Sequence, residues 1–131
     1  MRKIVKITLV IYIFLLIIFI IPNNANAKEN ASINYQTHIQ DVGWQNWKSN
    51  GDKSGTEGKS KRLEAIKIEL KNLENIKIKY QTHIQDIGWQ NWKYNGELSG
   101  TEGKSKRLEA IKIELEESEE YSVMYRVHIQ D

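Results

Sequence analysis

The sequence has no cysteine and only one proline among its 131 residues. The absence of cysteine excludes disulfides, on which small exported domains often rely, so packing of apolar side chains alone must stabilise the fold. The one proline is Pro22, so beyond it no strand is deprived of a backbone donor. The roughly 104 residues after position 27 suffice for one modest domain and are too few for two good cores.

A strong charge imbalance is also lacking. The formal net charge is +2, but three of the cations (Arg2, Lys3 and Lys6) lie close to the N-terminus. The residues after position 27 hold 16 Lys/Arg against 17 Asp/Glu, a balance of −1. Because no basic patch is present, we expect no nucleic-acid partner.

The first 27 residues have the composition of a secretory signal peptide. After the basic start, residues 7–21 are apolar apart from Thr8, and Ala25-Asn26-Ala27 is the small-x-small pattern that precedes a cleavage site. We therefore expect a signal-peptide helix at 1–27, cleavage after Ala27, and a secreted protein that meets a membrane only through this segment before cleavage. The alternative is an N-terminal membrane anchor, but 15 residues fall short of the ~20 needed to cross the hydrocarbon.

A 45-residue repeat occupies most of the remaining sequence. Residues 35–70 reappear as 80–115 with four differences, and a third copy extends from Tyr125 to Asp131. A period of this length is typical of units that cannot bury their apolar face alone. We predict a linker or first strand start at 28–34, repeat 1 at 35–79, repeat 2 at 80–124, and the start of a truncated third repeat at 125–131.

Apolar and polar residues alternate within each repeat, which is typical of half-buried strands. One such run places five residues on a single face: Ile76, Ile78, Tyr80, Thr82 and Ile84. A second run ends at Leu70; it also fits a helical stripe over residues 59–70, but its β-branched residues favour a strand. A third short strand is expected at 43–47. Asn50-Gly51 and its copy Asn95-Gly96 predict type I′ hairpin turns.

The predicted fold is therefore all-β, built from tandem 45-residue repeats of about four short strands each. Three such units suit closure around a pseudo-threefold axis, as in a β-prism or a β-trefoil-like domain. A propeller with blades of this size needs at least four copies. With the third repeat truncated, closure requires either a further segment or a partner chain.

The four tryptophans come in pairs with a spacing of three. On a continuous strand this odd spacing puts the two rings on opposite faces. We expect Trp44 and Trp89 in the core together with Tyr35 and Tyr80. Trp47 and Trp92 are expected to face outward, where Asn46 and Asn91 provide polar neighbours. The alternative is that both rings of each pair are structural.

The polar face of the first strand in each repeat carries His38 and Gln40, or His83 and Gln85. Beside an outward tryptophan, these side chains predict a hydrogen-bonding rim for a hydroxylated ligand. One histidine and one aspartate per repeat is a weak metal signal, because a zinc site needs at least three protein ligands. We therefore expect no metal, no cofactor and no catalytic residue, since no nucleophile with its base is visible either.

The sequence resembles the clostridial hydrophobic W, or ChW, repeat. The residues that carry the resemblance are the Gly-Trp pair, Ser-Gly-Thr-x-Gly and Arg-Leu-Glu-Ala-Ile, and they cover 35–70, 80–115 and the start at 125–131. The family implies a secreted protein of a Gram-positive, clostridium-like bacterium that binds or adheres to surface components or polysaccharide. Lys48 and Lys93 depart from the apolar residue common after the second Trp, which favours exposure of that ring here.

Together these features predict a secreted, non-catalytic binding module. The expected partner is a cell-wall or environmental polysaccharide, recognised through the tryptophans, glutamines and histidines of the repeat faces. Near-identical units suit a multivalent binder, in which weak contacts add through effective concentration. The alternative is a protein–protein adhesion or self-association module, because unpaired sheet edges are templates for association.

Overall fold

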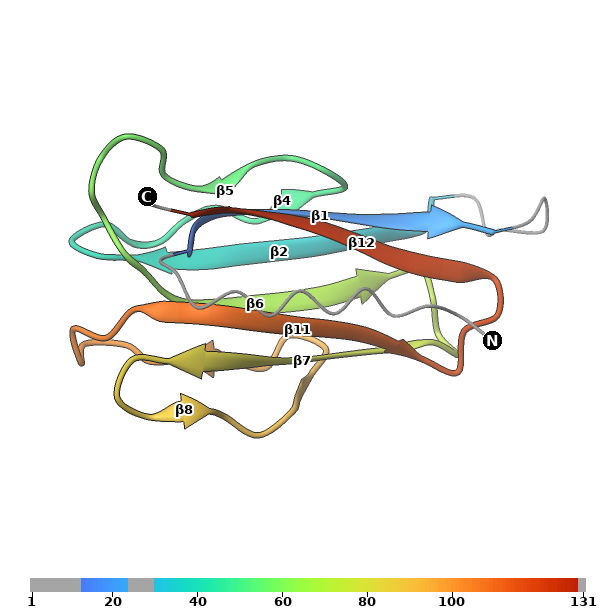
Figure 1. Ribbon diagram of the computed structural model, residues 1–131. Helices are drawn as coiled ribbons and strands as arrows, with labels where there is room; N and C mark the ends of the chain where they lie inside the picture. Colours follow the sequence, from blue (N-terminus) through green and yellow to red (C-terminus); the bar gives the residue numbers. More distant parts are fainter. Residues whose placement is uncertain (1–12, 24–29, 130–131) are drawn as a thin grey trace.

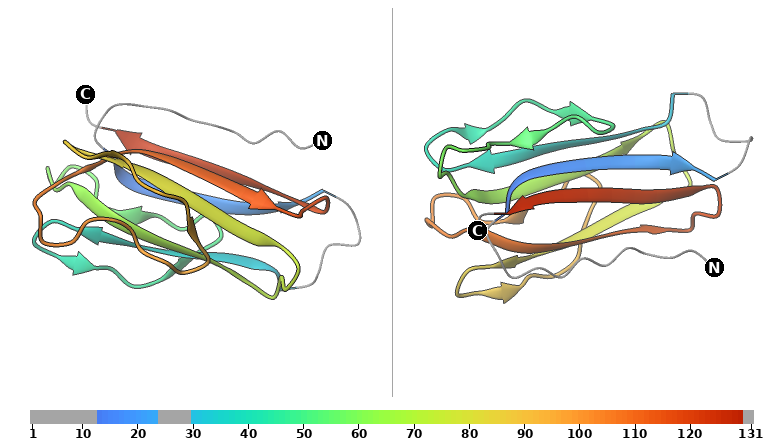
Figure 2. Two further views of the ribbon diagram at one scale, coloured as in Figure 1. Left: turned by 90° about the horizontal axis from the view of Figure 1, so that it is seen from below. Right: turned by 45° about the horizontal axis from the view of Figure 1, so that its top comes forward.

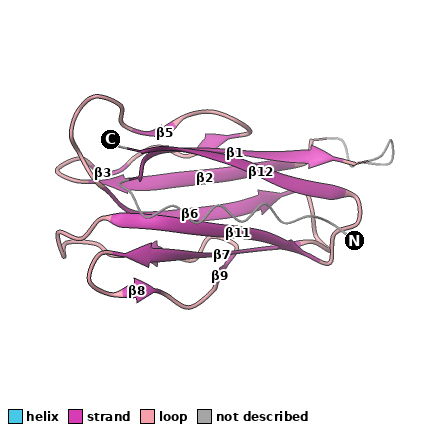
Figure 3. Ribbon diagram, viewed as in Figure 1, coloured by secondary structure: helices cyan, strands magenta, loops and turns pink. Residues whose placement is uncertain are grey.

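The computed structural model describes residues 13–23 and 30–129, which form strands, turns and loops and contain no helix (Figures 1 and 3). Six long strands make the framework: β1 (Ile13–Pro22), β2 (Ser32–Ile39), β6 (Leu63–Lys71), β7 (Lys77–Ile84), β11 (Leu108–Glu116) and β12 (Tyr121–Ile129). Six two-residue strands lie between them: β3 (Gly43–Trp44), β4 (Lys48–Ser49), β5 (Ser54–Gly55), β8 (Gly88–Trp89), β9 (Lys93–Tyr94) and β10 (Ser99–Gly100). The prediction of tandem all-β repeats is confirmed.

The described strands form three sheets, each built on one antiparallel pair of long strands (Figure 2). The pairs are β2 with β6, β7 with β11, and β12 with β1. All three pairs have the same register, set by the cross-strand partners Tyr35 and Ile68, Tyr80 and Ile113, and Tyr125 and Ile18. Three equivalent strand pairs agree with the predicted threefold repetition, whereas the assignment to a β-prism or a β-trefoil stays a prediction.

The core lies where the apolar faces of the three pairs meet. The predicted face is fully buried along β7, including Tyr80, whereas Ile76 just before the strand is partly buried. The counterparts on β2 and β6, among them Tyr35 and Ile68, are buried as well. Residues 63–71 form a strand, so the helical alternative for this segment is wrong. The prediction that Tyr35 and Tyr80 belong to the core is confirmed.

The N-terminal apolar segment differs from its prediction. Ile13–Pro22 is a strand and not part of a signal-peptide helix, and residues 1–12 lie outside the described ranges. The β-branched isoleucines suit an extended backbone, and β12 offers this segment an edge along its whole length. Leu16 and Ile18 are buried in the same core as the repeats. Over residues 13–23 and 30–129, the structure has no helix that could span a membrane.

Both Asn-Gly segments form turns, but only the first has the type I′ backbone, because Asn95 lacks a positive φ, and the hairpins predicted from them are wrong. Asn50 and Gly51 both have positive φ, 33° and 87°, as a type I′ turn requires. The flanking strands nevertheless part: β4 pairs with β2, whereas β5 pairs with β1. The reason is that Gly51 donates its N–H to the carbonyl of Ile18, 2.7 Å away, and so directs the chain toward the neighbouring sheet.

The same crossing joins repeat 2 to repeat 1. β10 pairs with β6 of the preceding repeat, and a Cβ on Gly100 would lie only 2.4 Å from the carbonyl oxygen of Glu64. The hydroxyl of Tyr80 accepts a hydrogen bond from the backbone N–H of Ile68 at 3.2 Å and donates to the carbonyl of Glu97. Each repeat therefore contributes strand and hydrogen-bond partners to the unit before it.

Candidate functional site

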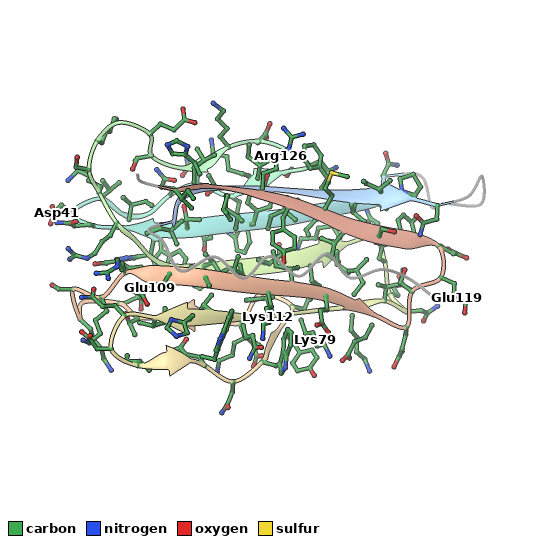
Figure 4. All side chains as sticks on the ribbon, in the orientation of Figure 1. Asp41, Lys79, Glu109, Lys112, Glu119 and Arg126 are labelled. Carbon is green, nitrogen blue, oxygen red and sulfur yellow. The ribbon has the colours of Figure 1, made fainter. Side chains whose placement is uncertain are left out.

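Each repeat carries a group of five side chains on its outward face, which we call the His–Trp cluster. In repeat 1 the cluster consists of Arg62, Glu64, Lys67, His38 and Trp44, and in repeat 2 of Arg107, Glu109, Lys112, His83 and Trp89. The two clusters share their geometry because the registers of β2 with β6 and β7 with β11 are the same. Glu109 and Lys112 project from β11 in Figure 4, on the same side of the sheet as Lys79.

A histidine and a tryptophan stand at the centre of each cluster. The rings of His38 and Trp44 meet edge to face, with centroids 5.4 Å apart and planes at 73°, and the copy in repeat 2 has 5.4 Å and 82°. Lys67 lies over the Trp44 ring with its Nζ 4.5 Å from the centroid, and Lys112 lies 4.3 Å from that of Trp89. Such cation–π contacts hold one face of each indole.

A carboxylate ties the basic groups of each cluster together. His38 Nδ1 lies 3.0 Å from Glu64 Oε2, while Arg62 Nε donates to Glu64 Oε1 at 2.7 Å. Glu64 is only 4% exposed, and a buried carboxylate needs such partners. In repeat 2 the corresponding distances from Glu109 are 3.1 Å and 2.8 Å. The contact in repeat 2 is a hydrogen bond that holds the His83 imidazole, whereas His38 Nδ1 is buried close to Glu64 without a hydrogen-bond partner.

The prediction that Trp44 and Trp89 belong to the core is wrong. Trp89 is 36% exposed and Trp44 is partly buried at the surface. Trp44 pairs across the strands with His38, so it shares the outward face of that histidine. The strand predicted over 43–47 ends already at Trp44, and parity along it could not orient the rings.

Trp47 and Trp92 lie at the surface as predicted, but to different degrees. Trp47 is 43% exposed, whereas Trp92 is half-buried beneath Lys79, whose Nζ lies 4.8 Å from the ring centroid. Repeat 1 has Asn34 at the position of Lys79, so within residues 13–23 and 30–129 no cation covers Trp47 from that position. The hydrogen bond from Lys79 to Glu116, at 2.7 Å, raises the pKa of the lysine, and Glu114 at 3.3 Å adds to the effect.

The side chains of the predicted glutamines form hydrogen bonds with the backbone. Gln40 and Gln85 each accept a hydrogen bond at 3.4 Å from the N–H of an arginine, Arg62 or Arg107, with their side-chain oxygens. Asn46 and Asn91 are exposed, in agreement with the prediction of polar surface groups. The geometry brings the histidines and tryptophans together and leaves the glutamines at the rim.

Sequence reasoning missed Gln90 and its copy Gln45. Gln90 Oε1 accepts hydrogen bonds from the N–H of Gly100 at 2.7 Å and from the hydroxyl of Thr82 at 3.4 Å. The only available signal was its place directly after Trp89 in each copy. We call these hydrogen bonds the Gln90 tether. A shallow depression of about 420 Å³ lies beside it and is lined by Trp89, Gln90, Asn91, Lys93, Leu98 and Gly100.

The first cluster also contacts repeat 2. The indole N–H of Trp44 donates to the carboxylate of Glu102, which lies in the loop after β10. Within the ranges that the structure describes, no group of three His, Cys, Asp or Glu residues comes together to hold a metal ion. The clusters consist of aromatic rings and paired charges.

The fold and the two clusters define an all-β tandem-repeat protein with a duplicated aromatic surface. The family model described as Clostridial hydrophobic W (ChW) matches residues 38–72 and 83–117, which is just over half of the chain. The chain therefore belongs to the ChW family, a repeat module often found in extracellular proteins. No curated protein and no solved structure gave a match.

Proposed function

We propose that this protein is a secreted, non-catalytic module that binds cell-surface or environmental polysaccharide through the aromatic faces of its repeats. The observation that carries the proposal is the duplication of the His–Trp cluster in equivalent registers of two sheets. An enzyme needs one assembled site, whereas a binder gains from several equal ones, because each further contact forms at high effective concentration. A β-prism-like arrangement of three sheets suits such repeated presentation.

The side chains suit a hydroxylated ligand. The uncovered ring of Trp47 offers a flat apolar platform, and the exposed amide of Asn46 lies next to it in the sequence. In repeat 2, the depression beside Trp89 supplies Asn91 and Lys93 as polar groups around an aromatic wall. A few fixed polar groups beside apolar surface are typical of small-ligand sites.

The test is a pull-down with insoluble peptidoglycan, cellulose and chitin, followed by tryptophan fluorescence. We expect binding to at least one of them, and a loss of roughly tenfold or more in affinity for Trp47→Ala and for Trp89→Ala. Met124→Ala is the matched control, because Met124 is equally exposed at 44% but lies on β12, away from both clusters. Absence of binding and of spectral change with every polysaccharide would refute the proposal.

Self-association or protein adhesion is the second candidate. It is favoured by one observation, that β12 is completed by β1, a strand from the far end of the sequence. Static light scattering at increasing concentration tests it. A constant monomer mass, together with glycan binding, would favour the first candidate.

A further inference from the structure

β1 occupies in its sheet the place that β6 and β11 occupy in theirs. Ile18 lies opposite Tyr125 in the register that joins β6 to β2 and β11 to β7. Leu16 and Ile18 are buried, and they take the core positions of Ile66 and Ile68. The place is thus defined by the repeats, although the strand that fills it does not come from a repeat.

The backbone contacts of β1 also reproduce those of β6. Gly51 donates to the carbonyl of Ile18 at 2.7 Å, and Gly96 donates to that of Ile68 at the same distance. The backbone of Ile18 hydrogen-bonds to the hydroxyl of Tyr35, just as the backbone of Ile68 hydrogen-bonds to the hydroxyl of Tyr80. β5 pairs with β1 as β10 pairs with β6. This position next to β12 and β5 therefore accepts a strand by its extended backbone and its inward apolar face.

The outward face of β1 differs from that of β6. The positions of Lys67 and Glu69 are taken by Ile17 and Phe19, which are only partly buried. The Phe19 ring lies where a Cβ on Gly51 would be, 2.3 Å from its Cε1. A Cβ on Gly96, the corresponding glycine of repeat 2, would lie 3.8 Å from Glu69 Oε2, so a β6-type strand fits this crossing with more room.

We infer that the place now filled by β1 is a strand-acceptor site for a strand of the Leu63–Lys71 type supplied by another repeat-bearing chain. Removal of residues 1–27 empties the site and leaves β12 and β5 without their shared neighbour. A donor strand with isoleucines at the two inward positions restores the backbone ladder by strand addition. The inference deepens the second candidate function and is independent of glycan binding.

The first experiment tests the register in which β1 pairs with β12. It uses the full chain, expressed without export so that residues 1–27 are retained. The chain has no cysteine, so Ile17→Cys with Arg126→Cys creates one possible bridge between cross-strand partners (Arg126 is labelled in Figure 4). We expect this pair to oxidise to a disulfide. The control pair, Ile17→Cys with Ser122→Cys, is displaced by four residues, roughly 13 Å, and should not bridge. Equal oxidation of both pairs would overturn the inference.

The second experiment tests the donor. Ile18→Lys in the full chain places a charge at a buried position and displaces β1, whereas Ile17→Lys changes an outward position and is the matched control. A peptide with the sequence of residues 62–71 should bind Ile18→Lys roughly tenfold or more tightly than the control or the wild type, whose sites are filled. The same peptide with lysine in place of Ile68 should not bind.

The outcomes separate this inference from the proposed glycan function. Equal binding of the two peptides, or no binding to Ile18→Lys, overturns the acceptor site while the glycan pull-down remains informative. If Ile18→Lys does not fold, the cysteine pairs still decide whether β1 fills the site. Loss of glycan binding with intact peptide binding would refute the glycan proposal alone.

Discussion

Replacing Tyr80 with phenylalanine should uncouple the two repeats. Tyr80 is fully buried, and its hydroxyl accepts from the N–H of Ile68 in repeat 1 and donates to the carbonyl of Glu97 in repeat 2. Glu97 is exposed, so water can hydrate its carbonyl, whereas Ile68 is buried. The variant leaves one buried donor unsatisfied, which costs about 1–3 kcal/mol. A loss near 2 kcal/mol corresponds to a fall in Tm of about 10 °C for a domain of this size.

The same substitution should change the response to alkaline pH. Burial raises the pKa of Tyr80 above its ordinary value of 10.0, so the folded state resists deprotonation that the unfolded chain accepts. Stability is therefore complete below pH 10 and is lost as pH rises further, at about 1.4 kcal/mol per unit for one such group. Burial raises the pKa of Tyr35 as well, and that contribution remains in both proteins. The difference in the free energy of unfolding between wild type and Tyr80→Phe should thus become smaller above pH 10.

Urea unfolding followed by circular dichroism at several pH values measures both effects. The control is Tyr94→Phe, because Tyr94 is 41% exposed and its loss should change stability by no more than about 0.5 kcal/mol. A loss of stability below about 0.5 kcal/mol for Tyr80→Phe would refute the proposed coupling. So would a stability difference from wild type that does not change with pH.

Three further substitutions test the ties between strands, each by urea unfolding. Gly100→Ala should cost more than about 2 kcal/mol, because its Cβ would lie 2.5 Å from the Cα of Ala65; a smaller loss would mean that β10 is not held against β6. Gln90→Leu removes three hydrogen bonds, two of them to Gly100, and should cost about 1–3 kcal/mol, with faster amide exchange at Gly100; unchanged exchange would contradict the tether. Lys112→Met removes the cation over Trp89 and should cost less than about 1 kcal/mol, so a larger loss would show that this lysine does more than cover the ring.

The buried faces of the long strands were predictable, because alternation along a strand is a local property. Tyr35, Tyr80 and Ile68 lie where that alternation places them. The orientation of Trp44 was not predictable, since it depends on pairing with β2 rather than on parity within its own two-residue strand.

The role of β1 and the Gln90 tether escaped prediction for a related reason. An apolar run such as residues 13–22 suits a helix or a strand, and the edge of β12 selects the strand. Gln90 acquires its role from Gly100, ten residues away across a loop. Contacts between units decide both features, and a single sequence does not display them.

The crossing of β5 and β10 onto the preceding sheet has a kinetic consequence. Both short strands have the sequence Ser-Gly, and the repeats that carry them differ at four of 36 positions. During folding, β10 can therefore dock onto β1, and β5 onto β6, at almost no local energetic penalty. Such misassembled chains must reopen before they reach the native order, a characteristic hazard of repeat proteins. The structure thus implies a slow refolding phase whose amplitude should fall as the two repeats are made less alike.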